Sequence, residues 1–590
     1  MHPGNPHLPF LLFLAVAIKI RWSGLPAPDG LDHVAIYSPP SSRDRDFLGY
    51  LFLNGSASWH DGHGELSLPR LPTLRAPYQF RLFRWPASEY SYNHIDHDQN
   101  PLPHGKHRVA VSGDVSVGDP ACPEQVHLAF TDAVDEMRVM FLCGDDGKRV
   151  VRYGLEEKET NWTEVGTEVS TYERKHMCDK PANHSVGWRD PGFVFDGLMK
   201  GLLPGRRRIQ KKDNIWAIVS KAVILKIQFV KEISEMVKVG SDTGGWSKTY
   251  NFISRDSEAN ETIAFLFGDM GTYVPYNTYI RTQAESLSTI EPIAANTPYH
   301  VCIGNHEYDW PSQPWKPSWA TYGKDGGGEC GIPYSVKFRM PGNSILPTGN
   351  GGPDTRNLYY SFDSGVVHFV YMSTETNFLQ GSEQYNFLKS DLEKVNRTRT
   401  PFIVFQGHRP MYTSSDETRD AALKQQMLQH LEPLLVTYNV TLALWGHVHR
   451  YERFCPMKNF QCVNTSSSFQ FPGAPAHPER SMFRGGVFGY TRLVATKEKL
   501  TLTYVGNHDG QVHDMVEIFS GQVSNNSSVA EAVDGTKLST GVSTVRRKYP
   551  LYLEIGGSVI FALLLGFGFG FLVRRKKEAA QWTPVKNEES

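Results

Sequence analysis

The sequence lacks the features of several common classes of protein. None of its seven cysteines forms a Cys-x-x-Cys pair, which argues against a thiolate zinc site. Its 61 lysines and arginines nearly balance its 62 aspartates and glutamates, so no global positive field attracts nucleic acid. The basic run Arg206–Lys212 is too short and isolated to indicate nucleic-acid binding. Aromatic residues make up 12% and charged residues 21% of the chain, which is typical of a well-packed globular protein.

The N-terminus has only part of a secretory signal. Leu8–Ile18 is apolar, but it has no basic n-region and no clear cleavage site before Lys19, so we interpret residues 1–24 as a weak or truncated signal peptide. Nine Asn-x-Ser/Thr sequons nevertheless favour the secretory pathway, although any one alone can be an unmodified surface turn. The predicted glycosylation sites are Asn54, Asn161, Asn183, Asn260, Asn396, Asn439, Asn464, Asn525 and Asn526.

Four of the cysteines are spaced so that they could close two loops. Cys455 and Cys462 would close a small loop, and Cys302 and Cys330 would close another. Because the number of cysteines is odd, at least one remains unpaired.

The C-terminal end predicts a membrane anchor. Ile555–Val573 is an uncharged apolar run of 19 residues, followed at once by Arg574–Lys577. A run of this length can cross a bilayer, and the positive-inside rule places the tail, 574–590, in the cytosol. We expect a transmembrane helix at 553–573, a polar stalk at 521–549, and a single-pass protein of the secretory pathway or cell surface. If the N-terminal signal fails, the same segment becomes a tail anchor in an organelle outer membrane; a buried core helix is the structural alternative.

The first half of the chain has the pattern of β-sandwich domains. Short alternating runs are separated by Pro, Gly and Asp turns, which predicts one domain at 25–118 and a second at 119–256 with an insertion at 206–238. Within that insertion, Lys221–Lys238 has helix-like periodicity and several lysines, so we favour a solvated amphipathic helix over a membrane or partner site. The predicted strands are His33–Tyr37, Tyr78–Trp85, Gln125–Thr131 and Met137–Leu142.

From Glu261 to about Phe519 apolar runs alternate with helical ones. This alternation predicts an α/β layered domain at 260–520, in which ligands gather at the carboxyl ends of the strands. The predicted strands are Ala264–Phe267, Tyr299–Ile303, Val366–Met372, Phe402–Phe405 and Leu442–Trp445, and the predicted helices are Asn277–Ala295, Ser382–Val395 and Ala421–Tyr438.

Four short motifs follow predicted strands and end in potential metal ligands. An aspartate carboxylate suits a trivalent ion, whereas an asparagine oxygen or an imidazole suits a divalent ion. Each residue alone has an ordinary explanation, such as a turn cap or a surface hydrogen bond, but four such strand ends in one order predict a two-metal site. The motifs Gly268–Gly271, Gly304–Glu307, Gln406–His408 and Gly446–His449 supply Asp269, Asn305, His408, His447 and His449.

The carboxylate that would join two such ions is missing. Between Asp269 and Asp309 the sequence contains no aspartate, and Glu285 and Glu291 lie in a stretch with helical periodicity. Two cations held close together repel strongly, and an anionic bridge makes their proximity tolerable. We therefore expect that two ions cannot both be held well.

The order of the motifs resembles that of the plant purple acid phosphatases, in the larger class with N-terminal β-sandwich domains. The resemblance covers about Glu261 to Phe519 and extends back to about residue 30. The C-terminal apolar segment is similar to that of a membrane-anchored branch of this class. Three further blocks resemble the same branch: Gly304–Trp310, Gly407–Thr413 and Leu444–Arg453. The resemblance implies fibronectin III-like β-sandwich domains followed by an α/β metallophosphoesterase domain.

The resemblance also implies acid phosphatase chemistry, in which a metal-bound hydroxide hydrolyses phosphate monoesters. His306 would contact the substrate phosphate or help to protonate the leaving alcohol. The implied cofactors are Fe³⁺ and a divalent iron, zinc or manganese ion. The five implied ligands divide between them: Asp269 and His449 for the ferric ion, and Asn305, His408 and His447 for the divalent ion.

The sequence departs from the family pattern in four places. The Gly-Asp-x-x-Tyr motif, which supplies the bridging carboxylate and a tyrosinate, is missing. The Val-x-x-His motif reads Phe405–His408. Arg409 follows where relatives continue with histidines near the substrate. Finally, Lys221–Lys238 and Asn464–Arg480 have the character of replaced or skipped segments, which suggests an alternative transcript or an imperfect gene model.

These departures lead to two hypotheses. In the first, the chain is an acid phosphatase with one divalent ion at Asn305, His408 and His447 and greatly reduced activity toward phosphate esters. In the second, it is a membrane-anchored binding protein that keeps the fold without catalysis. Neither hypothesis involves nucleic acid.

Overall fold

The computed structural model describes residues 18–520 with internal gaps. Within the described residues, no helix is both long and apolar enough to cross a membrane. The expectations for the stalk, the transmembrane helix and the tail, for residues 1–17 of the signal, for Glu285 and for the sequons at Asn464, Asn525 and Asn526 lie outside the described residues. The gaps are 45–46, 69–70, 72–75, 86–106, 156–158, 185–187, 189, 206–209, 221–222, 232–234, 270–272, 275–277, 281–289, 310, 312, 314–315, 321–322, 343, 348–351, 416–419 and 464–479, and for 210–220, 223–231, 273–274 and 278–280 only the backbone is described.

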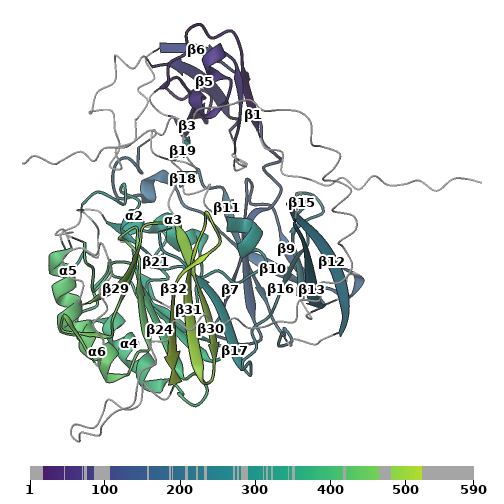
Figure 1. Ribbon diagram of the computed structural model, residues 1–590. Coiled ribbons are helices and arrows are strands. Elements are labelled where there is room, and N and C mark those ends of the chain that lie inside the picture. Colours follow the sequence, from purple (N-terminus) through teal and green to yellow (C-terminus); the bar gives the residue numbers. More distant parts are fainter. Residues whose placement is uncertain are drawn as a thin grey trace, which may run out of the picture. The chain divides into compact units, whose positions relative to one another are not determined.

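The first domain contains a six-stranded sheet, and two of its strands come from a much later part of the sequence. Its order is β18-β19-β3-β2-β5-β6, and β19 pairs antiparallel with β3, with Thr278 opposite Leu51. β18 and β19 follow directly after the segment that carries Asp269 (Figure 1). The strands are β2 (His33–Tyr37), β3 (Gly49–Phe52), β5 (Gln79–Arg84), β6 (His107–Val111), β18 (Tyr273–Val274) and β19 (Thr278–Ile280), beside a β1 (Lys19–Trp22) and β4 (Gly64–Ser67) pair.

The second domain contains an eight-stranded antiparallel sheet. The expected helix at Lys221–Lys238 is wrong, because its described residues lie in two strands, β13 and β14, and β14 pairs with β9 inside the sheet. The run Val223–Val230 is rich in Val, Ile and Phe, which favour strands. The members are β7 (Glu124–Phe130), β8 (Met137–Cys143), β9 (Val150–Gly154), β10 (Thr163–Ser170), β11 (Phe193–Met199), β14 (Glu235–Ser241), β15 (Gly245–Trp246) and β16 (Tyr250–Phe252), beside a hairpin of β12 (Gln210–Ser220) and β13 (Val223–Lys231).

The C-terminal α/β part contains two four-stranded sheets. In the first, of order β22-β23-β24-β25, the last three strands run parallel, and in the second, of order β17-β30-β31-β32, all pairs are antiparallel. Four of the five predicted strands are confirmed. The bounds are β22 (Tyr360–Ser364), β23 (Val367–Tyr371), β24 (Phe402–Gly407), β25 (Leu442–Trp445), β17 (Glu261–Leu266), β30 (Gly489–Thr496), β31 (Lys499–Gly506) and β32 (Val512–Phe519). Shorter pairs are β20 (Ile345–Leu346) with β21 (Thr355–Arg356), β26 (Tyr451–Phe454) with β29 (Ser481–Gly485), and β27 (Met457–Lys458) with β28 (Gln461–Cys462).

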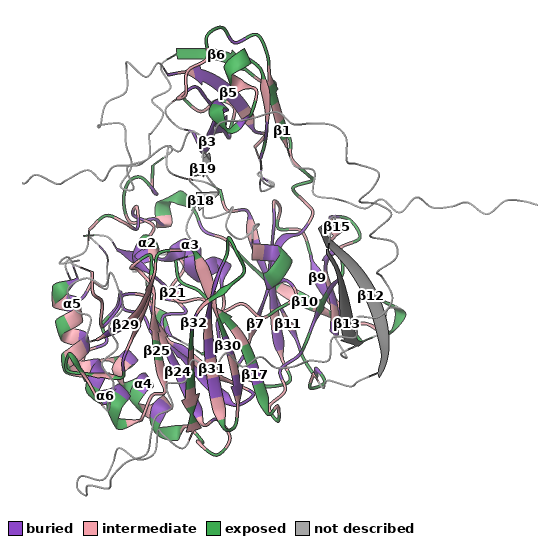
Figure 2. Ribbon diagram, in the orientation of Figure 1, coloured by how far each residue is buried: buried purple, intermediate pink, exposed green. Residues whose placement is uncertain are grey.

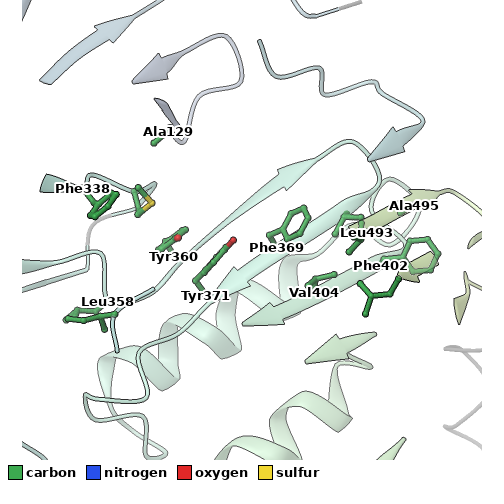
Figure 3. Packing of buried hydrophobic residues seen from close by; sticks show 14 of the residues in the cluster. Ala129, Phe338, Leu358, Tyr360, Phe369, Tyr371, Phe402, Val404, Leu493 and Ala495 are labelled. Carbon is green, nitrogen blue, oxygen red and sulfur yellow. The ribbon is translucent and has the colours of Figure 1, made fainter. Parts of the chain in front are cut away.

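The parallel strands are covered on both faces. Phe369 and Val404 lie in a core cluster with Leu493 and Leu502 of the antiparallel sheet (Figure 3), while Val370 and its neighbours pack against the helices. β23 and β24 are accordingly almost wholly buried (Figure 2), as strands buried on both faces require. Each fully buried Phe or Leu contributes about 1.5–3 kcal/mol. This core fixes the strand ends on which the site is built.

Two of the three predicted helices are confirmed. Ser382 caps α4 (Glu383–Lys394) by accepting a hydrogen bond from the backbone of Tyr385, as a serine at this position commonly does. The stretch predicted at Ala421–Tyr438 forms α5 (Ala421–Gln426), one π-turn (Met427–Leu431) and α6 (Glu432–Thr437). Short helices α2 (Asn305–Tyr308) and α3 (Ile332–Lys337) complete the described α/β part.

The chain between β17 and α2 differs from the expectation. The predicted helix Asn277–Ala295 is wrong at its start, where β19 forms, and the described helical residues are 290–294. The predicted strand Tyr299–Ile303 is not a strand. It follows Pro298, and it bonds the second domain through the Tyr299 amide, which donates to the carbonyl of Leu128, and through Nε2 of His300, which accepts from the amide of Phe130. The apolar pattern of this segment therefore reflects its partial burial and not pairing in a β-sheet.

One of the two expected disulfides is confirmed and the other is wrong. Cys455 and Cys462 form the predicted small-loop disulfide. The pairing of Cys302 with Cys330 is wrong, because Cys330 is bonded to Cys178 of the second domain. The 152-residue separation of that pair is invisible to arguments from local spacing. Cys302 is a free thiol, and burial raises its pKa to about 12.

Candidate metal centre

The five predicted ligands come from four segments that meet at one place. Asp269 follows β17, Asn305 opens α2, His408 follows β24, and His447 and His449 follow β25. The backbones of the last two segments are joined by a hydrogen bond from the Gly446 amide to the carbonyl of His408. Convergence of these segments is what the sequence predicts from strand ends.

Three ligand atoms approach a common point. The Oδ1 atom of Asn305 lies 2.6 Å from Nε2 of His408 and 3.3 Å from Nδ1 of His447. The rings of His408 and His447 are 5.1 Å apart and nearly perpendicular. Two imidazole nitrogens and one amide oxygen are donors that a borderline divalent ion accepts.

Two carboxylates fix the orientation of these donors. Asp325 accepts a 2.8 Å hydrogen bond from Nδ2 of Asn305, which turns Oδ1 of the amide toward the histidines. Asp420 lies 2.9 Å from Nε2 of His447, and a carboxylate at this distance favours the tautomer with the proton on Nε2 and a lone pair on Nδ1. An oxygen and a nitrogen that both accept hydrogen bonds thus face each other, an arrangement that a cation between them stabilises.

The other half of the site is sparser. Oδ2 of Asp269 accepts a 2.8 Å hydrogen bond from the backbone amide of His447, and its Oδ1 lies 4.0 Å from Nε2 of His449. Oδ1 is also 3.7 Å from Nδ1 of His408. The side chain of His449 is 59% exposed. This pair offers two donors and no described carboxylate between the two halves.

Two glycines allow the ligand segments to approach closely. A Cβ atom on Gly304 would lie 2.9 Å from the ring of His408, and one on Gly446 would lie 2.9 Å from Oδ2 of Asp269. Real Cβ atoms do not come this close to other atoms without displacing them. The glycines of the motifs are therefore required by the packing of the ligands themselves.

Burial sets the charge state around His408. It lowers the pKa of His408 well below its usual range, and the neighbouring His447 adds to this. Glu307, whose Oε2 accepts from the amide of Gly304 at 2.9 Å, has its pKa raised by burial to about 7. His306 is exposed beside these groups. The buried imidazole is thus neutral and able to bind a cation.

No bridging carboxylate occurs among the described residues. Glu291, one of the two glutamates after Asp269 considered above, is buried and turned toward the second domain, where it bonds the hydroxyl of Tyr250 and the amide of Gln125. In the part of the chain that the structure describes, no three His, Cys, Asp or Glu side chains are grouped as metal ligands. The set at Asn305 has two histidines, and its third donor is an amide oxygen.

Arg409 points into the protein. Its guanidinium is buried with only 4% of the side chain exposed, and it contacts three carboxylates, those of Asp309, Glu375 and Asp420. Burial raises the pKa of Asp309 to about 6 despite Arg409. Burial also favours protonation of Asp420, but His447 and Arg409 outweigh it and hold the Asp420 pKa below its usual range. Sequence reasoning missed Asp420 and Asp325, because each resembles an ordinary turn or cap residue.

Comparison with known proteins identifies the family of this chain. Residues 237–451 match the family model of calcineurin-like phosphoesterases, 123–207 that of the purple acid phosphatase N-terminal domain, and 462–515 that of the iron/zinc purple acid phosphatase-like protein C. The chain is 46% identical to "Probable inactive purple acid phosphatase 9" of Arabidopsis thaliana, over 97% of this chain and 94% of that protein. The chain belongs to the purple acid phosphatase family. That alignment spans 653 positions, more than the 590 residues of this chain, so the relative contains residues with no counterpart here.

Two further relatives agree with this assignment. "Probable inactive purple acid phosphatase 27" of Arabidopsis thaliana is 29% identical over 84% of this chain and 85% of its own length. The structure of purple acid phosphatase PPD1 from yellow lupin seeds is 25% identical and superposes with a TM-score of 0.65, covering 85% of this chain and 92% of that one. This member of the family therefore has the multidomain fold with an N-terminal domain and a metallophosphoesterase domain.

The residues fit one of the two metals that the family implies. Asn305, His408 and His447 present three converging acceptors, two of them held by carboxylates behind them. Asp269 and His449 present two donors that lie 4.0 Å apart. The divalent site is supported by its surroundings, and the ferric site is not.

Proposed function

We propose that this chain binds a single divalent ion at Asn305, His408 and His447 and hydrolyses phosphate monoesters far more slowly than a two-metal member of its family. The observation that supports this most is the contrast between three converging, oriented donors and a partner site of two. Two relatives have names that include the word "inactive", which supports a reduced rate of hydrolysis.

The chain's own residues support the binding half of the reaction better than the bond-breaking half. Asn305, His408 and His447 would hold the ion, which when bound can polarise a phosphoryl oxygen and lower the pKa of a water molecule. His306 is exposed beside the site and would donate a proton to the leaving alcohol or a hydrogen bond to the phosphate. Asp269 bonds the His447 amide, and together with His449 it would leave a second cation without the charge compensation that a bridge provides.

Metal content and turnover test this proposal together. Purified full-length protein should contain one Mn²⁺, Zn²⁺ or Fe²⁺ per chain by elemental analysis, and should hydrolyse p-nitrophenyl phosphate near pH 5 at least about 100-fold more slowly than an active family member measured in parallel. A His408→Ala variant, prepared in the same way, controls for adventitious metal and contaminating phosphatase. Two ions per chain with a rate equal to that of the active member would disprove the proposal.

A second candidate is a membrane-anchored binding protein without catalysis. It is favoured by the missing bridge and by the same relatives' names, and it would use the apolar segment at 553–573 as a single-pass anchor in the secretory pathway or an organelle outer membrane. The test is fractionation of cells that express the full chain and a variant lacking 553–590. Protein that retains metal and stays with membranes only when full-length, without turnover above the His408→Ala variant, would favour this candidate.

A further inference from the structure

His447 is held from behind by a carboxylate that the known ligand set does not include. Asp420 is the residue before α5, but its side chain makes no capping hydrogen bond to that helix. It lies instead 2.9 Å from Nε2 of His447, and both side chains are buried. On the opposite side of the same ring, Nδ1 faces Oδ1 of Asn305 at 3.3 Å. The ring is thus fixed between a carboxylate and the metal-facing amide.

Asp420 is itself held in place by Arg409. The guanidinium contacts Oδ1 of Asp420, Oε1 of Glu375 at 2.9 Å and Oδ2 of Asp309 at 3.1 Å. These three carboxylates come from the start of α5, the loop after β23 and the end of α2, and all are almost fully buried. A planar guanidinium can satisfy several carboxylates at fixed angles, which a lysine cannot do. One residue therefore joins the loops that surround the metal-facing donors.

We propose that Asp420, clamped by Arg409, is a positioning residue that keeps the proton of His447 on Nε2 and so presents Nδ1 to the metal. A histidine ligand commonly donates its other nitrogen to a carboxylate, and loss of that partner typically costs 10–100-fold in metal affinity. Asp420 does not touch the substrate. The inference rests on the proposed metal site for its consequence, but its structural core, the tautomer of His447, does not depend on bound metal.

The chain offers a matched control for a purely structural role. Asp309 belongs to the same buried cluster and bonds Arg409, but among the described residues it makes no ion pair or hydrogen bond with His447. Removal of either carboxylate should lower the stability of the cluster, since each leaves part of the guanidinium without a partner. Only removal of Asp420 should change His447. Asp309→Asn and Asp420→Ala therefore separate positioning from packing.

The first experiment measures the tautomer in metal-free, full-length protein. The protein is labelled with ¹⁵N-histidine, and the His447 signals are assigned by their absence from a His447→Gln variant at pH 8. We expect the Nε2–H tautomer in the unsubstituted protein and in Asp309→Asn, and a mixture of tautomers in Asp420→Ala. An Nδ1–H tautomer in the unsubstituted protein, or an unchanged His447 pattern in folded Asp420→Ala, would overturn the inference.

The second experiment measures Mn²⁺ affinity by calorimetric titration of the same proteins. Asp420→Ala should weaken binding 10–100-fold, and Asp309→Asn should stay within about threefold. Asp420→Asn, which keeps a hydrogen-bond acceptor without the charge, should fall between them, and Arg409→Lys should resemble it. Equal losses in Asp309→Asn and Asp420→Ala would overturn the positioning role. If the unsubstituted protein binds no Mn²⁺, the proposed function fails, while the tautomer experiment still decides the role of Asp420.

Discussion

The two halves of the metal centre differ in what lies behind their ligands. Behind Asn305 and His447 stand Asp325 and Asp420, which fix an amide and an imidazole. Behind His449 none of the described residues gives comparable support, and that side chain is more than half exposed. Both halves keep the Asp, Asn and His ligands of the four motifs that are present, although the motif with the bridging aspartate and the tyrosine is missing. The difference shows that the identity of a ligand and its preparation for binding are separate properties of a sequence.

The strongest way to break this comparison is to remove one ligand from each half. His408→Ala should abolish Mn²⁺ binding, a loss greater than the roughly 100-fold that an outer partner costs, because it deletes one of three converging donors. His449→Ala is the matched control and should change the affinity by less than about threefold. Isothermal titration of both variants measures this. Comparable losses in the two would mean that the halves are equally important.

A second test concerns the disulfide that joins the α/β part, close to Asp325, to the second domain. Cys330 bonds Cys178 across 152 residues, and it follows the stretch that carries Asp325. Cys330→Ser should lower the free energy of unfolding by about 2–5 kcal/mol, since the crosslink restricts a very long loop of the unfolded chain. Urea denaturation measures the loss. The control is Cys455→Ser, which removes a disulfide between residues with a sequence separation of 7 and should lower the free energy of unfolding by less. A larger loss in Cys455→Ser than in Cys330→Ser would contradict the explanation.

A third test asks whether a charged histidine in the parallel sheet contributes to stability without affecting the metal site. Burial lowers the pKa of His368, but bonds to Asp363 and Asp391 prevail and raise it to about 9. The charged histidine therefore stabilises the fold fully below its unfolded pKa of about 6.5, and this stabilisation disappears as the pH rises toward 9. His368→Gln should cost about 1.5–3 kcal/mol at pH 6 and progressively less at higher pH.

Unfolding curves at pH 6, 7.5 and 9 measure this dependence, with the exposed His60→Gln as control. A cost for His368→Gln that does not change with pH would refute the assignment. Mn²⁺ affinity should be unaffected at every pH at which the variant is folded, because His368 lies among β22, β23 and α4, away from the ligand loops.

The smallest expected effect compares the two glycines. Gly304→Ala would press against His408, and Gly446→Ala against Asp269. Overpacking of this kind costs about 1–3 kcal/mol, so Gly304→Ala should weaken Mn²⁺ binding about tenfold. Gly446→Ala should weaken binding less than Gly304→Ala, because its added Cβ meets Asp269 and reaches His447 only through the hydrogen bond from the His447 amide to Asp269. A larger loss in Gly446→Ala than in Gly304→Ala would reverse the comparison.

The fold could be predicted where apolar periodicity and burial coincide. The strands ending at Phe405 and Trp445 and the helix capped by Ser382 follow directly from their patterns. The stretch at Lys221–Lys238 could not be predicted, because lysines at helical spacing competed with a run of strand-forming residues. Pairing of β13 with β12 and of β14 with β9 decided the outcome. Likewise, nothing local signals that Cys330 pairs with a residue of another domain.

The candidate site divides in the same way. Asp269, Asn305, His408, His447 and His449 follow from motifs at strand ends, and the structure brings them together; that they bind metal stays a prediction. Asp420 and Asp325 could not be found, since an aspartate before a helix or between glycines has many ordinary uses. Only the three-dimensional arrangement reveals that Arg409, which directly follows His408, is buried against three carboxylates.

The strands β18 and β19 have a practical consequence for dissection of this protein. They lie between Asp269 and Asn305 in the sequence, yet β19 extends the sheet of the N-terminal domain beside β3. A fragment that begins near residue 260 would carry two strands without their neighbour, and a fragment that stops near residue 118 would lose two members of its six-stranded sheet and expose a bare edge. Truncation at either of these linear boundaries should therefore give insoluble fragments.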